Sequence, residues 1–460
     1  MKTIKILIVF AMSVSIAGCD DKLDLAPESQ RSSGNFYQTP TDFEQAILGA
    51  YSSLRGEFGD IVLYGDIRSD NTKPFISGSV TTRADFDNFS ILPANGAIES
   101  RWNNSYNAIS RVNAILDRID AIEMEEPTKN RIKGEALFIR ALVYFNLVRI
   151  YGNVPLVLHE IQGPEALEFP QSNPAEIYIQ IVEDLDRAVE FLPVEFQGAD
   201  VGRTTSTAAN ALLGRVYLTT GNFEEAETAL RKVTALEGSV VDLLEHYADV
   251  FDITNEYNKE IIFAVRWTND GVNGNGFNFA YTYINEPDNR ATTDLYNAYE
   301  ADDVRREQTI NATVSLTDTL IYKYGPAPSG LGESDWPVIR YSDVLLMLSE
   351  SLNEQGYVPD GEAFSLLNRT RKRAGLDELT TEEVPGQTEF RLAIAQERRV
   401  EFASEGLRWF DLVRTNRYVT VMTAKGFKVE EHHNLFPIPE TEILKVNNEN
   451  ILKQNPGYQQ

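Results

Sequence analysis

The sequence predicts a mostly α-helical protein in which paired helices support irregular loops and a few short strands. Three observations lead to this expectation. Apolar residues recur at helical spacing through most of the chain, helix start and stop signals bound these stretches, and few stretches alternate as a strand would. With 460 residues, of which 42% are hydrophobic, the chain can bury a sizeable core.

Helical patterns fill residues 35–460, which we expect to form a single domain. Thr41 and Glu44 have the spacing of a capping box at the first helix. Pro127 opens a long apolar helix, and Asn173 begins the one that follows.

The clearest internal repeat runs from Ala211 to Val233. Gly214, Tyr217 and Phe223 fall at the offsets of a tetratricopeptide repeat, in which small residues let two antiparallel helices touch. A peptide-binding groove is one interpretation, but a single clean repeat makes only a short superhelix, which favours a packing scaffold. Helix pairs of this kind are expected at about 127–192, 205–236, 338–374 and 388–417.

The densest cluster of charges lies between Gln396 and Arg414. A helix would bring Glu397 close to Glu401, and Gly406 would separate this helix from a second short one. Acid–base catalysis is one interpretation, but paired arginine and glutamate side chains more often stabilise a fold. We therefore predict a structural role for this cluster.

One short buried strand is predicted over Glu260 to Trp267. After it, Phe277, Phe279, Tyr281 and Tyr283 alternate with smaller or polar residues, which would place four rings on one face of an extended segment. The rings are core residues if that face is buried, and a binding platform if it is exposed.

The charge balance argues against two kinds of partner. The chain has 69 acidic and 42 basic residues and a net charge of -27. Nucleic acid is not expected as a partner, because phosphate binding requires surfaces rich in lysine and arginine. The same charge opposes adsorption to anionic lipid surfaces.

Residues 1–18 have the composition of a lipoprotein signal peptide, with Lys2 and Lys5 ahead of an apolar run that is too short to span a membrane. Cys19 follows directly and is the only cysteine, so it has no partner for an intramolecular disulfide. The sequence predicts lipidation of Cys19, and residues 19–34 then form a lipidated cysteine and polar tether to the membrane.

Several motifs, in order along the chain, resemble those of the SusD/RagB family. They are the lipobox IAGC (16–19), GEALFIRALVYFNLVRIYGNVPLV (134–157), the repeat unit of Ala211 to Val233, YSDVLLMLSESLNE (341–354), LNRTRKRAGL (367–376), ERRVEFASEGLRWFDLVR (397–414), LFPIPETEI (435–443) and QNPGY (454–458). The resemblance implies a SusD-like fold, in which tetratricopeptide-like helix pairs support irregular loops. It also implies a lipoprotein of the outer membrane, exposed at the cell surface, that captures oligosaccharides and delivers them to a SusC-like TonB-dependent transporter. No catalysis and no cofactor are implied.

Variable loops at about 58–105 and 265–337 are expected to bind the ligand. A site for a neutral sugar needs flat aromatic rings with polar groups at the rim. The candidate ligand contacts are Asp66, Arg68, Asp70, Asn71, Arg83, Trp102, Asn103, Trp267, Tyr281, Tyr283 and Trp336. Trp102 would serve equally well as a core residue of its helix, and Asp66, Asp70 and Asn71 as formers of turn hydrogen bonds.

Other functions were weighed against glycan capture. Peptide capture, known in RagB-like members of the family, is the alternative, and a pure protein-binding scaffold is a further one. A secreted hydrolase would need paired carboxylates such as Asp66 with Asp70 or Glu397 with Glu401, but the sequence contains no HExxH or GxSxG motif.

No metal site is expected from the sequence. Of the four histidines, two are adjacent, and adjacent residues do not converge easily on one metal ion. A structural calcium site in the loop 270–278 fits poorly, because Val272 and Gly274 occupy positions where a calcium loop needs oxygen ligands.

Overall fold

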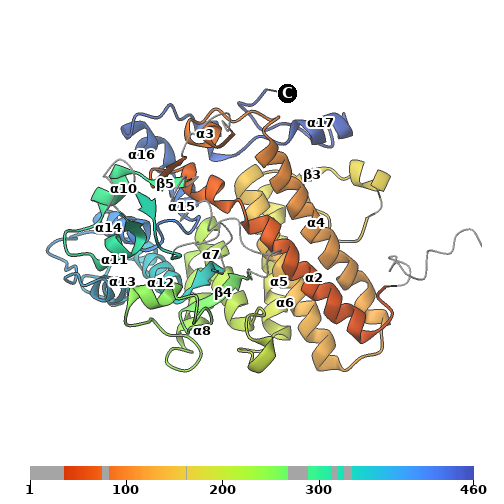
Figure 1. Cartoon of the computed structure of the whole chain (residues 1–460), viewed down its shortest axis with the longest axis horizontal. Helices are drawn as coiled ribbons and strands as arrows, with labels where there is room; N and C mark the ends of the chain where they lie inside the picture. Colours follow the sequence, from red (N-terminus) through yellow and green to blue (C-terminus); the bar gives the residue numbers. More distant parts are fainter. Residues whose placement is uncertain are drawn as a thin grey trace, which may run out of the picture.

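The computed structural model describes residues 36–74, 82–161, 163–267, 289–311, 319–325 and 334–459. Helices dominate these residues (Figure 1), which confirms the predicted fold class. The helices are α2 (Pro40–Phe58), α3 (Thr82–Asp87), α4 (Gly96–Arg118), α5 (Glu126–Tyr151), α6 (Pro174–Phe191), α7 (Ser206–Thr220), α8 (Phe223–Thr234), α10 (Thr293–Ala298), α11 (Val304–Thr309), α12 (Tyr341–Gln355), α13 (Glu362–Arg373), α14 (Gln387–Glu401), α15 (Arg408–Arg414), α16 (Tyr418–Ala424) and α17 (Glu440–Val446). Short 3-10 or π-helical turns join several of them, including η1 (Leu63–Ile67).

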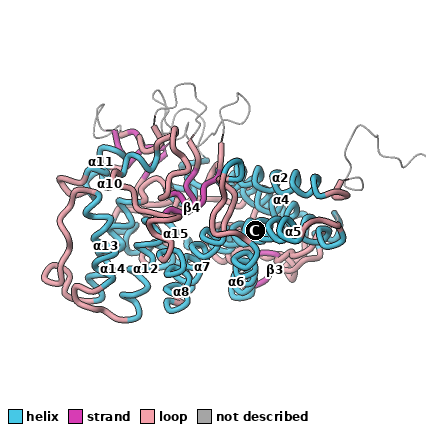
Figure 2. Tube along the Cα trace, turned by 90° about the horizontal axis from the view of Figure 1, so that it is seen from below, coloured by secondary structure: helices cyan, strands magenta, loops and turns pink. Residues whose placement is uncertain are grey.

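The long helices form two groups. Figures 1 and 2 show α2, α4 and α5 side by side at one end of the molecule and α12, α13 and α14 at the other, with α7 and α8 between them. One continuous hydrophobic core runs through most of these helices, and a smaller one lies under α12, α13 and α14 around Phe364, Phe390 and Phe402.

The start of α2 differs from the prediction. Thr39 caps the helix and Asp42 completes the capping box, so the predicted pairing of Thr41 with Glu44 is wrong. Proline suits the first turn of a helix, because the amide proton it lacks would have no partner there. Pro40 therefore moves the start of the helix two residues toward the N-terminus.

Helix α5 packs against α6, and α7 packs against α8. In the second pair Gly214 faces Leu230 so closely that a Cβ at this position would lie 2.4 Å from the leucine side chain. A glycine is therefore needed where the two helices touch, as the repeat pattern indicates.

The strands form three small sheets. They are β1 (Thr72–Pro74), β2 (Val154–Pro155), β3 (Gln171–Ser172), β4 (Ile261–Val265), β5 (Asn289–Ala291), β6 (Ile310–Asn311), β7 (Leu320–Ile321) and β8 (Trp336–Arg340). One sheet has the order β1-β5-β7-β6, and β2 pairs with β3 and β4 with β8, all antiparallel. The predicted strand over Glu260 to Trp267 is β4. Its partner, β8, lies at the other end of the variable segment expected at about 265–337.

The charged cluster of Gln396 to Arg414 joins two helices, as predicted. Helix α14 ends at Glu401 and α15 begins at Arg408, with Gly406 at φ 71 between them. Glu401 is fully buried and contacts Arg305, Arg340 and Arg373.

Electrostatics explain why this buried cluster is stable. Burial alone would raise the pKa of Glu401, but the guanidiniums of Arg373, Arg340 and Arg305 hold it well below its ordinary value. Arg305 also bonds Glu397 at 2.6 Å and so bridges the two glutamates. Because both carboxylates are neutralised by arginines inside the core, the geometry agrees with a structural role for this cluster.

Candidate functional site

The two predicted ligand-binding regions meet at neighbouring sheets. Strand β1 pairs with β5, so Pro74 lies opposite Asn289, and in the second sheet Val265 of β4 lies opposite Trp336 of β8. The Ser334 hydroxyl donates to the Tyr324 carbonyl at 3.0 Å, which joins the chain after β7 to the chain before β8.

These pairings place the described ends of four chain segments on one side of the molecule, near α10 and α11 (Figure 2). We call the described residues at these ends, together with Tyr257, the loop face. It consists of Lys73, Pro74, Tyr257, Arg266, Trp267, Asn289, Arg290, Leu320 and Asp335.

One half of the loop face surrounds Trp267. Its backbone N–H donates to Oδ1 of Asp335 at 2.8 Å, and Arg266 Nε lies 3.6 Å from the other carboxylate oxygen. Burial raises the pKa of Asp335 to about 6, although the Trp267 amide and Arg266 oppose the shift. The indole of Trp267 is itself 6% exposed and belongs to the core.

A partly exposed aromatic ring lies beside Arg266. Tyr257 is 41% exposed, and the Arg266 guanidinium stands 4.6 Å from the centre of its ring. The backbone of Arg266 is held in place, because its carbonyl accepts a hydrogen bond of 2.8 Å from Arg55 Nε. A flat ring next to a guanidinium offers a sugar both an apolar face and hydrogen-bond donors.

The other half of the loop face carries two cations. Lys73 of β1 lies directly opposite Arg290 of β5, and both side chains are partly exposed. Burial raises the pKa of Asp87 to about 6, and Lys73 opposes that shift.

Asp66 and Asp70 do not reach this surface. They are 0% and 3% exposed and bond to the joint between α14 and α15. Asp66 accepts from the Gly406 amide at 2.9 Å, and Asp70 receives two bonds from Arg408 at 2.8 and 3.0 Å. The prediction that they contact ligand is wrong, because their carboxylates attach η1 and β1 to the core.

Arg68 and Asn71 are also buried, so the same correction applies to them. The Arg68 guanidinium lies 4.1 Å from the centre of the Phe89 ring and donates to backbone carbonyls. Asn71 accepts from Arg399 Nε at 2.9 Å. The polar residues of this segment therefore position strand β1 instead of facing a ligand.

The remaining candidates differ in burial and in whether the structure describes them. Trp336, predicted in a loop, is the first residue of β8, is 1% exposed and stacks on Tyr324, so it is a core residue. Arg83 is half-buried in α3. Tyr281 and Tyr283 lie outside the described residues, so their proposed role in a binding platform stays a prediction.

Trp102 and Asn103 lie on α4 and line a separate cavity. It has a volume of about 270 Å³ and shares no lining residue with the loop face. Trp102 is 5% exposed and packs against Tyr106 and Tyr151, whereas Asn103 is exposed. This cavity is therefore distinct from the loop face.

Sequence reasoning missed Tyr257, Arg266, Asp335, Lys73 and Arg290. Arg266 and Asp335 adjoin tryptophans that were singled out, so a search of their neighbours would have found them. Lys73 and Arg290 come together only because two short strands far apart in the chain pair with each other.

No group of three or more His, Cys, Asp or Glu side chains in the described ranges has an arrangement that could hold a metal ion. Among the helices that the structure describes, none has both the length and the apolar character needed to cross a bilayer.

A framework of paired helices with aromatic and charged side chains at the ends of its loops defines a helical ligand-binding protein. Two family models match the chain: the SusD family over residues 326–458, and a family described as starch-binding and associating with the outer membrane over residues 23–218. The chain belongs to the SusD family.

Known relatives match along nearly the whole chain. SusD-like protein P2 of Formosa agariphila is 27% identical, with 100% of both chains covered, and a SusD-like protein of Bacteroides ovatus is 25% identical, covering 90% of this chain and 83% of the relative. Among solved structures, a laminarin binding SusD-like protein is 28% identical, has a TM-score of 0.80, and covers 92% of this chain and 100% of its own.

A further structure has the same fold at lower identity. Surface glycan-binding protein A of Bacteroides thetaiotaomicron, solved in complex with laminarihexaose, is 21% identical with a TM-score of 0.79, covering 91% of this chain and 100% of its own.

Proposed function

We propose that this protein captures oligosaccharides at the cell surface and delivers them to a SusC-like TonB-dependent transporter. The observation that carries the proposal is the likeness, over 92% of this chain, to a laminarin binding SusD-like protein. The loop face supports it, because the exposed ring of Tyr257 and the Arg266 guanidinium supply both kinds of contact that a sugar requires.

Attachment to the outer membrane is part of the same proposal. Cys19, which lies outside the described residues, would carry the lipid, and residues 20–34 would span the distance to the folded domain. The match to a family described as associating with the outer membrane supports this location.

Binding without chemical conversion is the third part. The described carboxylate pair that first suggested chemistry, Glu397 with Glu401, is bonded to arginines inside the core. A hydrolase would need such a pair in reach of the glycosidic bond. A glycan held on the loop face would therefore be released unchanged.

A soluble form that begins at Asp20 tests the proposal. Calorimetric titration with laminarin-derived and other oligosaccharides should give saturable binding to at least one of them, and chromatography of the mixture should recover the ligand intact. Peptide binding without any glycan binding would replace the proposal by peptide capture. Appearance of shortened oligosaccharides would replace it by hydrolysis.

A further inference from the structure

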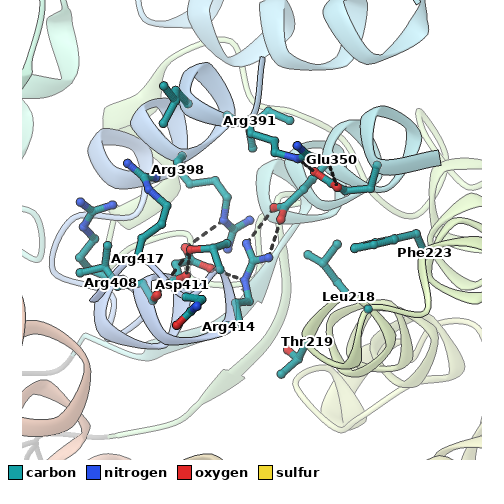
Figure 3. Close-up of a pocket in the computed structure, with 18 residues that line it drawn as sticks. Leu218, Thr219, Phe223, Glu350, Arg391, Arg398, Arg408, Asp411, Arg414 and Arg417 are labelled. Carbon is teal, nitrogen blue, oxygen red and sulfur yellow. Dashed lines mark hydrogen bonds and ion pairs between the residues drawn. The ribbon is translucent and has the colours of Figure 1, made fainter. Parts of the chain in front are cut away.

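A second cavity, of about 330 Å³, opens between the α7–α8 pair and the α14–α15 segment (Figure 3). Part of its lining is apolar, with Leu218, Phe223 and Leu392. The charged lining residues are Arg391, Arg398, Arg408, Arg414 and Arg417 together with Glu350, Glu354 and Asp411. Five arginines against three carboxylates make this cavity cationic within a protein whose net charge is -27.

Most of these arginines already have carboxylate partners. The pairs are Arg391 with Glu354 at 2.6 Å, Arg398 with Asp411 at 2.9 Å, Arg414 with Glu350 at 2.5 Å and Arg408 with Asp70 at 2.8 Å. Figure 3 draws the contacts among Arg398, Asp411, Arg414 and Glu350, and those of Arg391, as dashed lines. Because their charges are balanced, these four arginines are accounted for by the fold.

Arg417 is different. No hydrogen bond or ion pair joins its guanidinium to another side chain in the part of the chain that the structure describes, and no dashed line reaches it in Figure 3. The side chain is half-buried on the cavity wall. The guanidinium therefore keeps N–H donors that a ligand in the cavity could engage.

The surroundings of Arg417 hold an excess of positive charge. Its pKa is lowered by burial and then by the neighbouring Arg408, with Asp70 acting in the opposite direction. Asp70 is already shared, since Arg408 lies 2.8 Å and Arg399 3.1 Å from its oxygens. Arg399 also pairs with Asp294 at 2.6 Å. Because Asp70 is already bonded to Arg408 and Arg399, a bound anion would reduce the remaining repulsion between Arg417 and Arg408.

We propose that this cavity is a second ligand site, which takes a short saccharide bearing a carboxylate, of the uronic acid class. The carboxylate bonds to Arg417, and the apolar faces of the sugar ring lie against the apolar part of the lining. The saccharide in this assignment rests on the proposed function, whereas the need for a negative charge rests on Arg417 alone. A cavity of about 330 Å³ is at the small end of ligand sites, which suits a short ligand.

The experiment compares a charged probe with a neutral one of the same shape. Methyl β-D-glucuronide and methyl β-D-glucoside are titrated at low ionic strength into the soluble protein that begins at Asp20. The glucuronide should bind at least about tenfold more tightly, because a charge-assisted bond to a guanidinium is lost in the glucoside. Added salt should weaken glucuronide binding.

Two variants locate the binding in this cavity. Arg417→Gln should weaken glucuronide binding about tenfold. Leu392→Glu should also weaken it, because this exposed rim position would then repel the carboxylate; it is 52% exposed, so the variant should fold. Arg187→Gln on α6, an exposed arginine away from the cavity, is the charge-matched control and should bind as the parent does.

Equal affinity for both probes, or unchanged glucuronide binding in Arg417→Gln, would overturn the inference. Binding of N-acetyl-alanine as tight as that of the glucuronide would overturn the assignment to a sugar. A parallel titration with laminarin oligosaccharides separates the two proposals, because Arg417→Gln should leave that binding unchanged. Failure of the parent to bind any neutral glycan would count against the proposed function and not against the anion site.

Discussion

The joint between α14 and α15 and the loop face are built from the same residue types, yet they differ in burial. At the joint, Glu401 is fully buried among three arginines, and each charge has a partner. On the loop face, the ring of Tyr257 is 41% exposed and Arg266 meets Asp335 only at 3.6 Å. A stretch that combines arginine, acidic and aromatic residues therefore does not by itself indicate a binding site. Whether these side chains can bind a ligand depends on how far they are exposed to solvent.

The largest effect is expected at the joint. Glu401→Ala should lower the free energy of unfolding by about 3–5 kcal/mol, because it leaves buried arginines without a carboxylate partner. Urea unfolding followed by circular dichroism measures this loss. Glu245→Ala, at an exposed loop position, is the control and should change stability by less than about 0.5 kcal/mol. A Glu401→Ala protein as stable as the control would show that the joint does not hold the fold together.

The joint should also set the response to acid. The pKa of Glu401 is held well below its ordinary value of 4.5, so this group stays ionised in the folded protein at a pH where it is protonated in the unfolded chain. Its contribution to stability is present above pH 4.5 and lost as the pH falls through the folded-state pKa. The free energy of unfolding, measured by urea unfolding at a series of pH values from neutral downward, should show this loss.

Glu401→Gln is the matched variant for the acid series. It keeps the shape of the side chain but has no carboxyl group to titrate, so its stability should fall less steeply with pH than that of the parent. If the free energy of unfolding falls equally steeply with pH in the parent and the variant, Glu401 does not contribute to acid sensitivity.

The smallest effect on stability is expected on the loop face. Tyr257→Ala should change the free energy of unfolding by less than about 1 kcal/mol, because the side chain is 41% exposed and lies outside the core. It should weaken oligosaccharide binding by about 1 kcal/mol, or roughly fivefold, through loss of the aromatic face. Leu444→Ala on α17, at a position that is 68% exposed, is the control for removal of a surface side chain. A marked loss of stability with unchanged binding would reverse the roles of the two regions.

Helices were largely predictable because their signals are local. The stop near Gly152 and the start at Asn173 depend on residues within a few positions of each other. The error at the first helix has the same cause, since two capping boxes compete within five residues and Pro40 decides between them.

The candidate site was harder to predict because burial is not a local property. Asp66, Asp70 and Asn71 have the composition of a polar turn, but the side chains that cover them come from α14 and α15, more than three hundred residues later. Trp336 is likewise hidden by its neighbour Tyr324 and by β4.

The sequence by itself determined the helical class, the helix pairs, the family and the structural character of Gln396 to Arg414. Periodicity, caps and motifs depend only on residues that are close together in the sequence. Only the tertiary structure decided which polar and aromatic side chains reach solvent. That choice depends on strand pairings such as β1 with β5 and on ion pairs such as Asp70 with Arg408, which join distant parts of the chain. Arg417 is a similar case: among the described residues no carboxylate pairs with it, because the nearby Asp70 is bonded to Arg408 and Arg399.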